Sequence, residues 1–394
     1  MKIVMIGKKH GCVRMRKAAW YARSQGHECH LIMGINKGAG ALNAYPQNMW
    51  VDGFPTYTSN AQNSKELVAA IDMMKPDVVY AHELEPMWAL THQATDEQAA
   101  AHILDGVPME DTGMSVTPTP WPLVYDAHEN EMGTWQPSYR SPKFMEDRAW
   151  IEDKIVGEAD RVTAATPGIA GRIHYEFNRT AVLVNNAPAA PQRMPERALC
   201  RRILDIPEEM RVVIFNGYAT SERKLNELVF AMSLLGSKWK IVLMGNSGFC
   251  PLTDAALRGA GALFLNAMPY PYDPANQSIG MLDYTSMGDV GYCGAELGID
   301  NWKVGLPNKA FEYGFAGVPM VCSEMPDTVA LVKKYKLGSS FDGTPRDLAA
   351  KIEETYANGF SVAARACFIN EQGYDKLGGP AMLLALENAV GARK

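Results

Sequence analysis

Short apolar runs alternate with helical segments along most of the chain, and this alternation is the feature that most constrains its fold. The run Lys2–Gly7 is apolar at nearly every position and ends in glycine, which is typical of a strand buried on both faces of a parallel sheet. A helical segment over Val13–Ser24 and a second apolar run at Glu28–Met33 follow. This pattern predicts right-handed βαβ units in a doubly wound α/β sheet.

The alternation begins again after a proline-rich stretch. Asn186–Glu196 contains three prolines and shows no hydrophobic periodicity, so we interpret it as part of an interdomain linker. Apolar runs at Arg211–Asn216 and Trp239–Met244 then alternate with further helical segments. We therefore predict two Rossmann-like domains that face each other across a cleft. The predicted parts are an N-terminal domain over 1–190 with a surface insertion at about 91–119, a linker over 191–204, a C-terminal domain over 205–375 and a C-terminal helix over 376–394 that can pack back on the first domain.

Composition excludes several classes of function. The 394-residue chain has a formal net charge of −6, with 47% hydrophobic and 21% charged residues, values typical of a compact soluble protein. We therefore expect no general electrostatic attraction to nucleic acid or anionic lipid, although a local basic patch is compatible with these totals. No stretch reaches the ~18 apolar residues of a membrane span.

The seven cysteines and the N-terminus bear on metal binding and location. No two cysteines form a C-x-x-C pair, and no histidine stands beside a cysteine pair as a zinc site would require. The first apolar run ends at Gly7 and is followed at once by Lys8 and Lys9, which does not fit a signal peptide. We expect a cytoplasmic protein without a metal or cofactor; peripheral contact with the inner face of a membrane is compatible with this expectation.

Three loops at predicted strand ends carry the candidate functional residues, because ligands of open α/β sheets bind beyond the carboxyl ends of the strands. The first loop, Gly7–Arg14, contains Gly11 and several basic side chains. Glycines permit close approach of a ligand to the backbone, and Lys or Arg can contact phosphate. It lacks the G-x-G-x-x-G pattern, and a solvated basic turn explains it equally well.

The second loop follows the apolar run that ends at Tyr125. Asp126, His128 and Glu129 place three ionisable groups within four positions, which packing does not require. Asp126 can cap a turn and His128 can be an ordinary interior histidine. Because the strand end faces the predicted cleft, we favour a functional role for this loop.

The third loop leads into a helix within Gly305–Val321. Pro307 suits the first helical turn, and the N–H groups of Asn308, Lys309 and Ala310 then point out of the helix start, where they can bind a diphosphate. Glu312 lies one turn further, on a face that can reach a ribose diol. An ordinary first-turn glutamate that favours the helix dipole is an equally good explanation of Glu312.

These loops together resemble the family 4 glycosyltransferases, which have the two-domain GT-B fold. Leu306–Val321 (LPNKAFEYGFAGVPMV) is similar to the family signature LPNKLFEYMAAGLPVV. Three further motifs occur in the expected order: Arg14–Ala19 with the later Gly26–Glu28 resembles R-x-R-K-E-A…GHE, Asp126–Glu129 resembles D-x-H-E, and Val184–Pro188 contains N-x-P. The resemblance covers about Met1 to Gly338.

The resemblance implies a retaining transfer of a sugar from a nucleotide-sugar, most often a UDP-sugar, held mainly by the C-terminal domain. Glu312 would bind the ribose hydroxyls, Arg223 the leaving diphosphate, and His128 the sugar. The full assignment has His128, Asp126 and Arg223 as catalytic, Glu129 and Arg16 on the acceptor side, and as donor-binding residues Gly11, Arg14, Arg223, Lys224, Gly245, Asn308, Lys309, Ala310 and Glu312.

The chain departs from the family at two positions. Most relatives have Glu-x7-Glu, but the position eight before Glu312 is Val304, so Asp300 or Glu296 is a candidate substitute. Many relatives also carry Arg where this chain has Tyr218. A sugar-nucleotide 2-epimerase and a non-catalytic binding subunit are the alternatives. The acceptor stays open between a glycan, a lipid-linked sugar, a small molecule and a modified nucleic-acid base.

Overall fold

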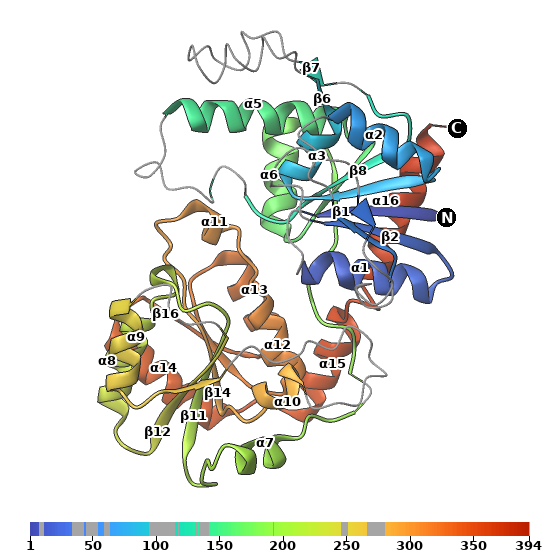
Figure 1. Ribbon diagram of the computed structural model, residues 1–394. Helices are drawn as coiled ribbons and strands as arrows, with labels where there is room; N and C mark the ends of the chain where they lie inside the picture. Colours follow the sequence, from blue (N-terminus) through green and yellow to red (C-terminus); the bar gives the residue numbers. More distant parts are fainter. Residues whose placement is uncertain are drawn as a thin grey trace. The chain divides into compact units, whose positions relative to one another are not determined.

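A computed structural model describes residues 1–7, 12–33, 43–44, 54–58, 64–93, 115–116, 118–130, 133, 142–191, 193–245, 251–265 and 280–393. Contacts divide the chain into two compact units (Figure 1). The first unit consists of Met1–Asn185 together with Gly378–Lys394, and the second of Asn186–Leu377. Among the described residues, no helix is both long enough and apolar enough to cross a membrane.

The first unit contains an eight-stranded sheet in the order β10-β9-β8-β5-β1-β2-β4-β3. Its strands pair in parallel except for the antiparallel contact of β3 with β4. The strands are β1 (Lys2–Gly7), β2 (Glu28–Met33), β3 (Asn43–Ala44), β4 (Thr56–Thr58), β5 (Val78–His82), β8 (Leu123–Ala127), β9 (Arg161–Ala164) and β10 (Ala181–Leu183). A separate antiparallel pair, β6 (His92–Gln93) and β7 (Ser115–Val116), lies at the ends of the predicted insertion, most of which falls outside the described residues.

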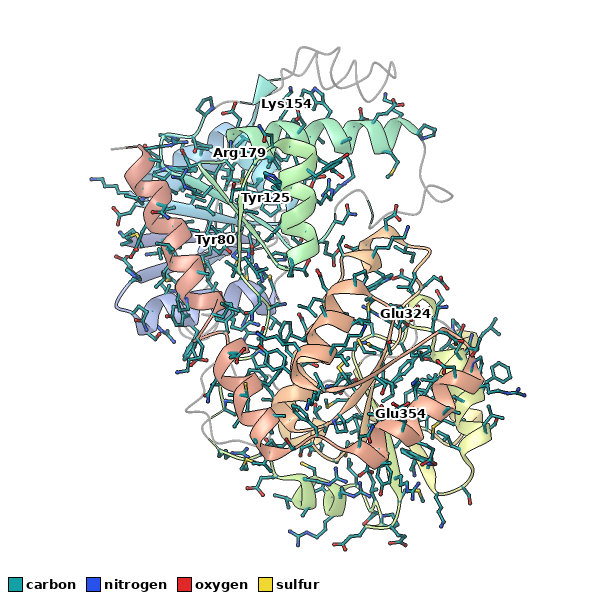
Figure 2. All side chains as sticks on the ribbon, turned by 180° about the vertical axis from the view of Figure 1, so that it is seen from behind. Tyr80, Tyr125, Lys154, Arg179, Glu324 and Glu354 are labelled. Carbon is teal, nitrogen blue, oxygen red and sulfur yellow. The ribbon has the colours of Figure 1, made fainter. Side chains whose placement is uncertain are left out.

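Helices cover both faces of this sheet. The helices are α1 (Val13–Ser24), α2 (Ser64–Met73), α3 (Leu84–Thr91), α5 (Pro142–Glu158), α6 (Pro167–Phe177) and α16 (Gly378–Ala392). Helix α16, drawn in red in Figure 1, packs on α1 and on the strands β5, β8, β9 and β10. The β1, β5 and β8 strands are buried on both faces, and the rings of Tyr80 and Tyr125, labelled in Figure 2, lie fully inside.

The second unit contains a six-stranded parallel sheet in the order β13-β12-β11-β14-β15-β16. Its strands are β11 (Arg211–Asn216), β12 (Trp239–Met244), β13 (Leu263–Leu265), β14 (Val290–Cys293), β15 (Met320–Ser323) and β16 (Gly338–Phe341). Its helices are α7 (Arg197–Ile203), η4 (Ser221–Arg223), α8 (Leu225–Leu235), α9 (Pro251–Gly259), α10 (Met281–Thr285), α11 (Asp300–Lys303), α12 (Asn308–Ala316), α13 (Pro326–Tyr335), α14 (Pro345–Asn358) and α15 (Val362–Gln372). The predicted doubly wound α/β architecture is confirmed.

The predicted linker over 191–204 differs from the structure. Most of its second half forms helix α7, which packs on α10 within the second unit. Cys200 is fully buried there, and Arg201 donates to the carbonyl oxygen of Met287 at 2.9 Å. These buried contacts make α7 a part of the second domain, although its proline-rich surroundings suggested a linker.

Candidate functional site

Each sheet has a switch point, where consecutive connections run to opposite sides of one strand. In the first unit it lies between β1 and β5, because the chain runs from β1 to β2 on one side and later from β5 to β8 on the other. In the second unit it lies between β11 and β14. Ligands of such sheets bind beyond the strand ends at this point, and both groups of predicted site residues are found there.

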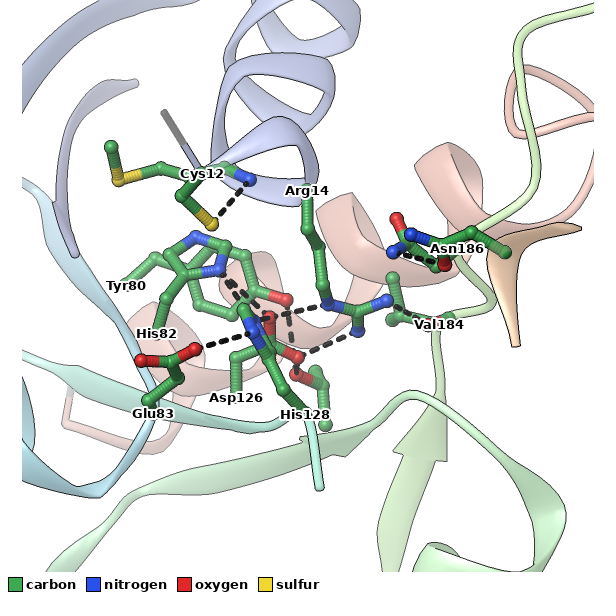
Figure 3. Close-up of polar contacts among 12 residues, drawn as sticks. Cys12, Arg14, Tyr80, His82, Glu83, Asp126, His128, Val184 and Asn186 are labelled. Carbon is green, nitrogen blue, oxygen red and sulfur yellow. Dashed lines mark hydrogen bonds and ion pairs between the residues drawn. The ribbon is translucent and has the colours of Figure 1, made fainter. Parts of the chain in front are cut away.

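Strand register brings the polar residues of the first unit into one row. Gly7 of β1 pairs with His82 of β5, His82 with Asp126 of β8, and Asp126 with Thr163 of β9. Paired residues in neighbouring strands present their side chains on the same face of the sheet. His82, Asp126 and Thr163 therefore meet at the carboxyl end of the sheet. We call this group, with Arg14, Glu83 and His128, the Asp126 network (Figure 3).

Asp126 is fully buried and accepts hydrogen bonds from most members of this network. Arg14 donates from Nε to Oδ2 at 2.8 Å and from Nη2 to Oδ1 at 2.7 Å. The Thr163 hydroxyl donates to Oδ1 at 2.6 Å. His128 Nε2 and His82 Nδ1 lie 2.7 and 2.8 Å from Oδ2. The carboxylate is thus held by a bidentate arginine and by two imidazoles, which fixes its orientation.

The two histidines carry different charges. Burial lowers the pKa of His82 to about 4, so His82 is neutral. Burial also acts to lower the pKa of His128, but the Asp126 charge and hydrogen bond outweigh it and raise the pKa to about 10. For Asp126, the opposing effect of burial is outweighed by the Arg14 and His128 charges, which hold its pKa well below the ordinary value. His128 is therefore an imidazolium at neutral pH.

His82 and Glu83 belong to this site although the sequence analysis did not single them out. The Glu83 carboxylate lies 3.6 Å from Nδ1 of His128, on the side away from Asp126. Glu83 has a φ of 73°, an uncommon conformation for a residue with a side chain, and such backbone is concentrated at functional sites. His82 donates from Nδ1, and its buried Nε2 has no partner among the described residues. Both residues directly follow the apolar run Val78–Ala81, just as Asp126 follows its own run, and this was the available signal.

His82, Asp126 and His128 are also the arrangement that most resembles a metal site in the described part of the chain. Their ligand atoms, however, already lie within hydrogen-bond distance of one another. The Arg14 guanidinium also covers both oxygens of Asp126. A cation would have to displace these donors and stand beside a fixed positive charge, so the arrangement fits a compensated hydrogen-bond network better than a metal centre.

Arg14 was predicted to contact the donor phosphate, but its guanidinium binds groups of the first unit. Its side chain is buried, and besides Asp126 it donates from Nη1 to the carbonyl oxygen of Val184 at 2.6 Å. The guanidinium is therefore committed within the first unit and orients Asp126. Of the other residues predicted here, Glu129 is exposed and Arg16 is half-buried. Gly11 lies outside the described residues.

In the second unit, helix α12 is fixed over the switch point by Tyr313. The Tyr313 hydroxyl lies within hydrogen-bond distance of the carbonyl oxygens of Ile214 in β11 (3.1 Å) and Tyr292 in β14 (2.9 Å), and it accepts from the N–H of Asn216 at 3.2 Å. Gly291 makes room for the ring, since a Cβ there would lie 2.6 Å from it. This contact places the start of α12 at the end of β11.

Two cations meet at this place, and each lies on an aromatic ring. Nζ of Lys309, in the first turn of α12, is 3.8 Å from the centre of the Phe215 ring. The Arg223 guanidinium is 4.1 Å from the centre of the Trp302 ring. Lys309 is only 6% exposed, and its Nζ has no hydrogen-bond partner among the described residues. Burial, and then the charge of Arg223, lower the pKa of Lys309 to about 7.

Glu312 lies one turn further along α12 and is buried. Its Oε2 accepts a hydrogen bond from Asn216 Nδ2 at 3.0 Å, and the same Nδ2 lies 2.9 Å from the Thr285 hydroxyl. The N-cap residue of α12 is Pro307, which makes no side-chain capping hydrogen bond. We call Asn216, Arg223, Lys309, Glu312 and this helix start the Lys309 site. It combines cations, backbone N–H groups and a carboxylate, which is the donor and acceptor set that a nucleoside diphosphate requires.

Gly217 and Gly245 bring two loops together beside this site. Both have positive φ values, 125° and 145°, and a Cβ at Gly245 would lie 2.1 Å from the carbonyl oxygen of Gly217. The close approach explains why glycine stands at position 245. A Cβ at Gly217 would lie 3.7 Å from Nζ of Lys309, so this loop lies against the buried Lys309 side chain.

The remaining predicted residues of the second unit have local partners. Lys224 lies 3.5 Å from Glu296, and Asn308 accepts from Asn186 at 2.7 Å. The N–H of Ala310 donates to the carbonyl of Pro307 at 2.9 Å, so this amide is used within the helix start.

The two candidate substitutes for the acid missing at Val304 are placed differently. Glu296 stands next to the η4 loop, because its N–H donates to the Glu222 carbonyl at 2.8 Å. Asp300 is exposed on α11 and pairs with Lys303. Glu296 is therefore the better placed of the two. Tyr218 is 53% exposed and does not replace the arginine of relatives.

Comparison with known proteins gives a clear result only at the level of structure. No family model matches the chain, and no curated protein is significantly similar in sequence. Sucrose-phosphate synthase from Thermosynechococcus elongatus is 12% identical with a TM-score of 0.65, over 100% of this chain and 97% of that one. A glycosyltransferase from Rickettsia africae is 13% identical with a TM-score of 0.64, over 98% of both chains.

HepE from Anabaena, whose structure contains UDP-glucose, is 14% identical with a TM-score of 0.64, over 100% of this chain and 99% of that one. Similarity of this extent at such low identity concerns the fold. It agrees with the resemblance inferred from the four motifs. The chain therefore has the GT-B fold of these glycosyltransferases, with two doubly wound α/β domains.

Proposed function

We propose that the protein is a glycosyltransferase that uses a nucleotide-sugar, with a UDP-sugar as the favoured donor. The observation that carries the proposal is the Lys309 site at the switch point of the second unit. Lys309 stands in the first turn of α12, the charge of Arg223 acts on it, and the N-cap residue Pro307 makes no side-chain hydrogen bond to the helix start. A diphosphate offers anionic oxygens to the Arg223 guanidinium and to Nζ of Lys309, which has no hydrogen-bond partner among the described residues. The fold supports the same conclusion, since HepE binds UDP and UDP-glucose.

In this proposal, each member of the Lys309 site contacts a different part of the donor. Arg223 binds the diphosphate, and its stacking on Trp302 orients the guanidinium before the donor arrives. Glu312, whose Oε2 is oriented by the hydrogen bond from Asn216, accepts hydrogen bonds from the ribose hydroxyls. Neutralising the leaving diphosphate is the main electrostatic task in the reaction.

The Asp126 network has the role of binding the sugar. His128 is held as an imidazolium between Asp126 and Glu83 and is 11% exposed at its side chain. Because both ring nitrogens donate and the pKa is about 10, His128 cannot take up a further proton and is unsuited to act as a general base. It orients the sugar by hydrogen bonds, and Arg14 and Asp126 hold it in place. Glu129 and Arg16 are proposed for the acceptor side.

We propose retention of anomeric configuration, as the family resemblance implies, and the protonated state of His128 supports it because His128 cannot take the acceptor proton. The bond from the anomeric carbon to the diphosphate oxygen breaks, and the acceptor oxygen bonds to that carbon on the same face. The acceptor proton passes to the leaving phosphate oxygen, so no protein base is needed. The acceptor itself is a hydroxyl of unidentified chemistry.

A panel of UDP-, GDP- and ADP-sugars tests the proposal in two steps. Thermal shift identifies the donor, because a ligand that binds only the folded state raises Tm by mass action. NMR then follows the identified donor with and without simple sugar acceptors, before mutarotation. We expect a retained anomer in the transfer or hydrolysis product. An inverted anomer would contradict the mechanism, and conversion of the donor to a 2-epimer without an acceptor would favour the epimerase alternative.

A further inference from the structure

Lys309 is buried, whereas Arg223, the other basic residue of the Lys309 site, is only partly buried. Lys309 is only 6% exposed, yet its Nζ has no hydrogen-bond partner in the described part of the chain. Its neighbours are the Phe215 ring at 3.8 Å and the backbone of Gly217. An ammonium group can donate three hydrogen bonds, and leaving all of them unmade in a buried place is costly.

Among the described residues, the charged groups around Lys309 do not offset the cost of burying its ammonium form. The titratable groups that act on it are Arg223 from η4, Cys293 from β14 and Glu312 from its own helix. Arg223 repels a second positive charge. Burial raises the pKa of Cys293 to about 11, so this thiol is neutral. Glu312 does favour the ammonium form, but burial and Arg223 together outweigh it.

The free protein thus holds a buried amine in the first turn of α12, within reach of the charge of Arg223. Resting on the proposed function, we propose that Lys309 binds the donor diphosphate through its side chain and takes up its proton when the diphosphate arrives. In the free site Lys309 is largely an amine above neutral pH, since its pKa is about 7. A diphosphate places negative oxygens beside Nζ, and the group then takes one proton from water and donates as an ammonium.

This coupling has a consequence for the proposed reaction. A phosphate-bound ammonium beside Arg223 supplies a second positive charge on the leaving group, at the place where negative charge develops. After transfer, release of the nucleoside diphosphate returns the proton to solvent. Donor binding therefore weakens as pH rises above about 7, whereas a site built on Arg223 alone would show no such dependence.

Calorimetry of UDP binding to the full chain at pH 8.0 tests the proposal. At this pH the phosphates of UDP are fully ionised, because their last pKa is about 6. Titrations in two buffers of different ionisation enthalpy give the number of protons exchanged. We expect the wild-type protein to take up close to one proton per UDP. Lys309→Met should take up none and bind about tenfold to a hundredfold more weakly at pH 6.5.

Two further variants separate a specific effect from a structural one. Lys309→Arg carries a permanent charge and should bind UDP without proton uptake and with a flat pH dependence. Lys303→Met removes an exposed lysine of α11 that pairs with Asp300, and it should leave both affinity and uptake unchanged. The Tm of each variant, measured without ligand, shows whether it is folded.

The outcomes distinguish this proposal from the proposed function. Wild-type UDP binding without proton uptake, or unchanged affinity in Lys309→Met, would overturn the role of Lys309 while leaving the glycosyltransferase assignment intact. Proton-coupled binding of UDP without sugar transfer or donor hydrolysis would leave the diphosphate site standing and remove the assignment. If the wild-type protein binds none of UDP, GDP and ADP, both fail.

Discussion

The two candidate sites occupy equivalent positions in their sheets, but their basic side chains have different neighbours. In the Asp126 network, the positive groups Arg14 and His128 are matched by the carboxylates of Asp126 and Glu83 at 2.7 to 3.6 Å. In the Lys309 site, the two cations lie on the aromatic rings of Phe215 and Trp302. The first arrangement is complete within the protein. In the second, Nζ of Lys309 has no hydrogen-bond partner among the described residues, and under our proposal a ligand anion provides one.

This difference indicates how the two domains divide the work. A network whose charges are already paired is stable without a ligand and is suited to hold one side chain, His128, in a fixed position. A buried lysine beside a fixed cation is disfavoured as an ammonium in the free protein and gains most when an anion binds. Selection of the donor is therefore expected mainly in the second unit, and orientation of the transferred sugar in the first.

The largest expected effect is on the stability of the first unit. Asp126→Ala leaves Arg14 buried without its carboxylate, and such a loss costs about 3–5 kcal/mol. Glu28→Ala is the control, because Glu28 pairs with Lys2 in an exposed position at 3.4 Å, where the cost is below about 1 kcal/mol. Chemical denaturation measures both variants. A cost for Asp126→Ala no larger than that of the control would show that the network is not a paired structural unit.

The next largest effect is on donor binding and turnover in the second unit. Arg223→Ala should lower kcat/KM, because about 2–4 kcal/mol of transition-state stabilisation is lost. The free energy of unfolding should change little, because Arg223 is only partly buried. Arg258→Ala is a matched control, since Arg258 also lies over an aromatic ring, that of Phe264, at 4.3 Å. Steady-state kinetics with the donor identified by thermal shift measures the effect. Wild-type kinetics in Arg223→Ala would remove Arg223 from the diphosphate site.

The sequence predicts the sheets well because their strands are short, continuous apolar runs. Predicted and observed limits agree at β1, β2, β11 and β12. Strand β16 (Gly338–Phe341) was not predicted, since its sequence GSSF has a single large apolar residue and it pairs with a neighbour on one side only. Its existence depends on the edge offered by β15, which no local pattern reveals.

The site residues were predicted by type but not by partner. Arg14 and Asp126 are 112 positions apart, so their bidentate pairing depends on the register of β8 against the rest of the sheet. The sequence therefore suggested phosphate binding for an arginine whose donors are used inside the domain. Trp302 was missed for a similar reason, because only the tertiary fold brings its ring in α11 against Arg223 of η4.

The contrast between the sites also predicts opposite effects of pH on stability. The pKa of His128 is raised to about 10 in the folded state, so its stabilising effect is complete below about pH 6.5 and is lost as pH rises towards 10. The pKa of Lys309 is lowered to about 7, so its destabilising effect is complete below pH 7 and is relieved as pH rises towards 10.5. Each slope has a limit of about 1.4 kcal/mol per pH unit.

Unfolding of His128→Gln and Lys309→Met between pH 6 and 10 measures these slopes. The wild-type protein should be more stable than His128→Gln at pH 6, with a difference that narrows as pH rises. It should be less stable than Lys309→Met at pH 6, and this difference should also narrow. The difference in free energy of unfolding between wild type and variant should have opposite signs for His128 and Lys309. If both differences have the same sign and the same slope with pH, the two sites do not differ in how they stabilise charge.

The smallest expected effect is that of Glu312→Gln. This variant distinguishes a glutamate that contacts the ligand from one that only stabilises its helix. Glu312→Gln keeps an oxygen that can accept from Asn216, so the free energy of unfolding should change by less than about 1 kcal/mol. Hydrogen bonds to a charged acceptor are stronger than those to a neutral one, by about 1 kcal/mol. Affinity for the donor should therefore fall several-fold, and affinity for inorganic pyrophosphate, which has no ribose, should not. Calorimetry with both ligands decides the point: an equal loss for pyrophosphate would mean that Glu312 acts on the diphosphate end of the site, and no loss for either would leave it a structural residue of α12.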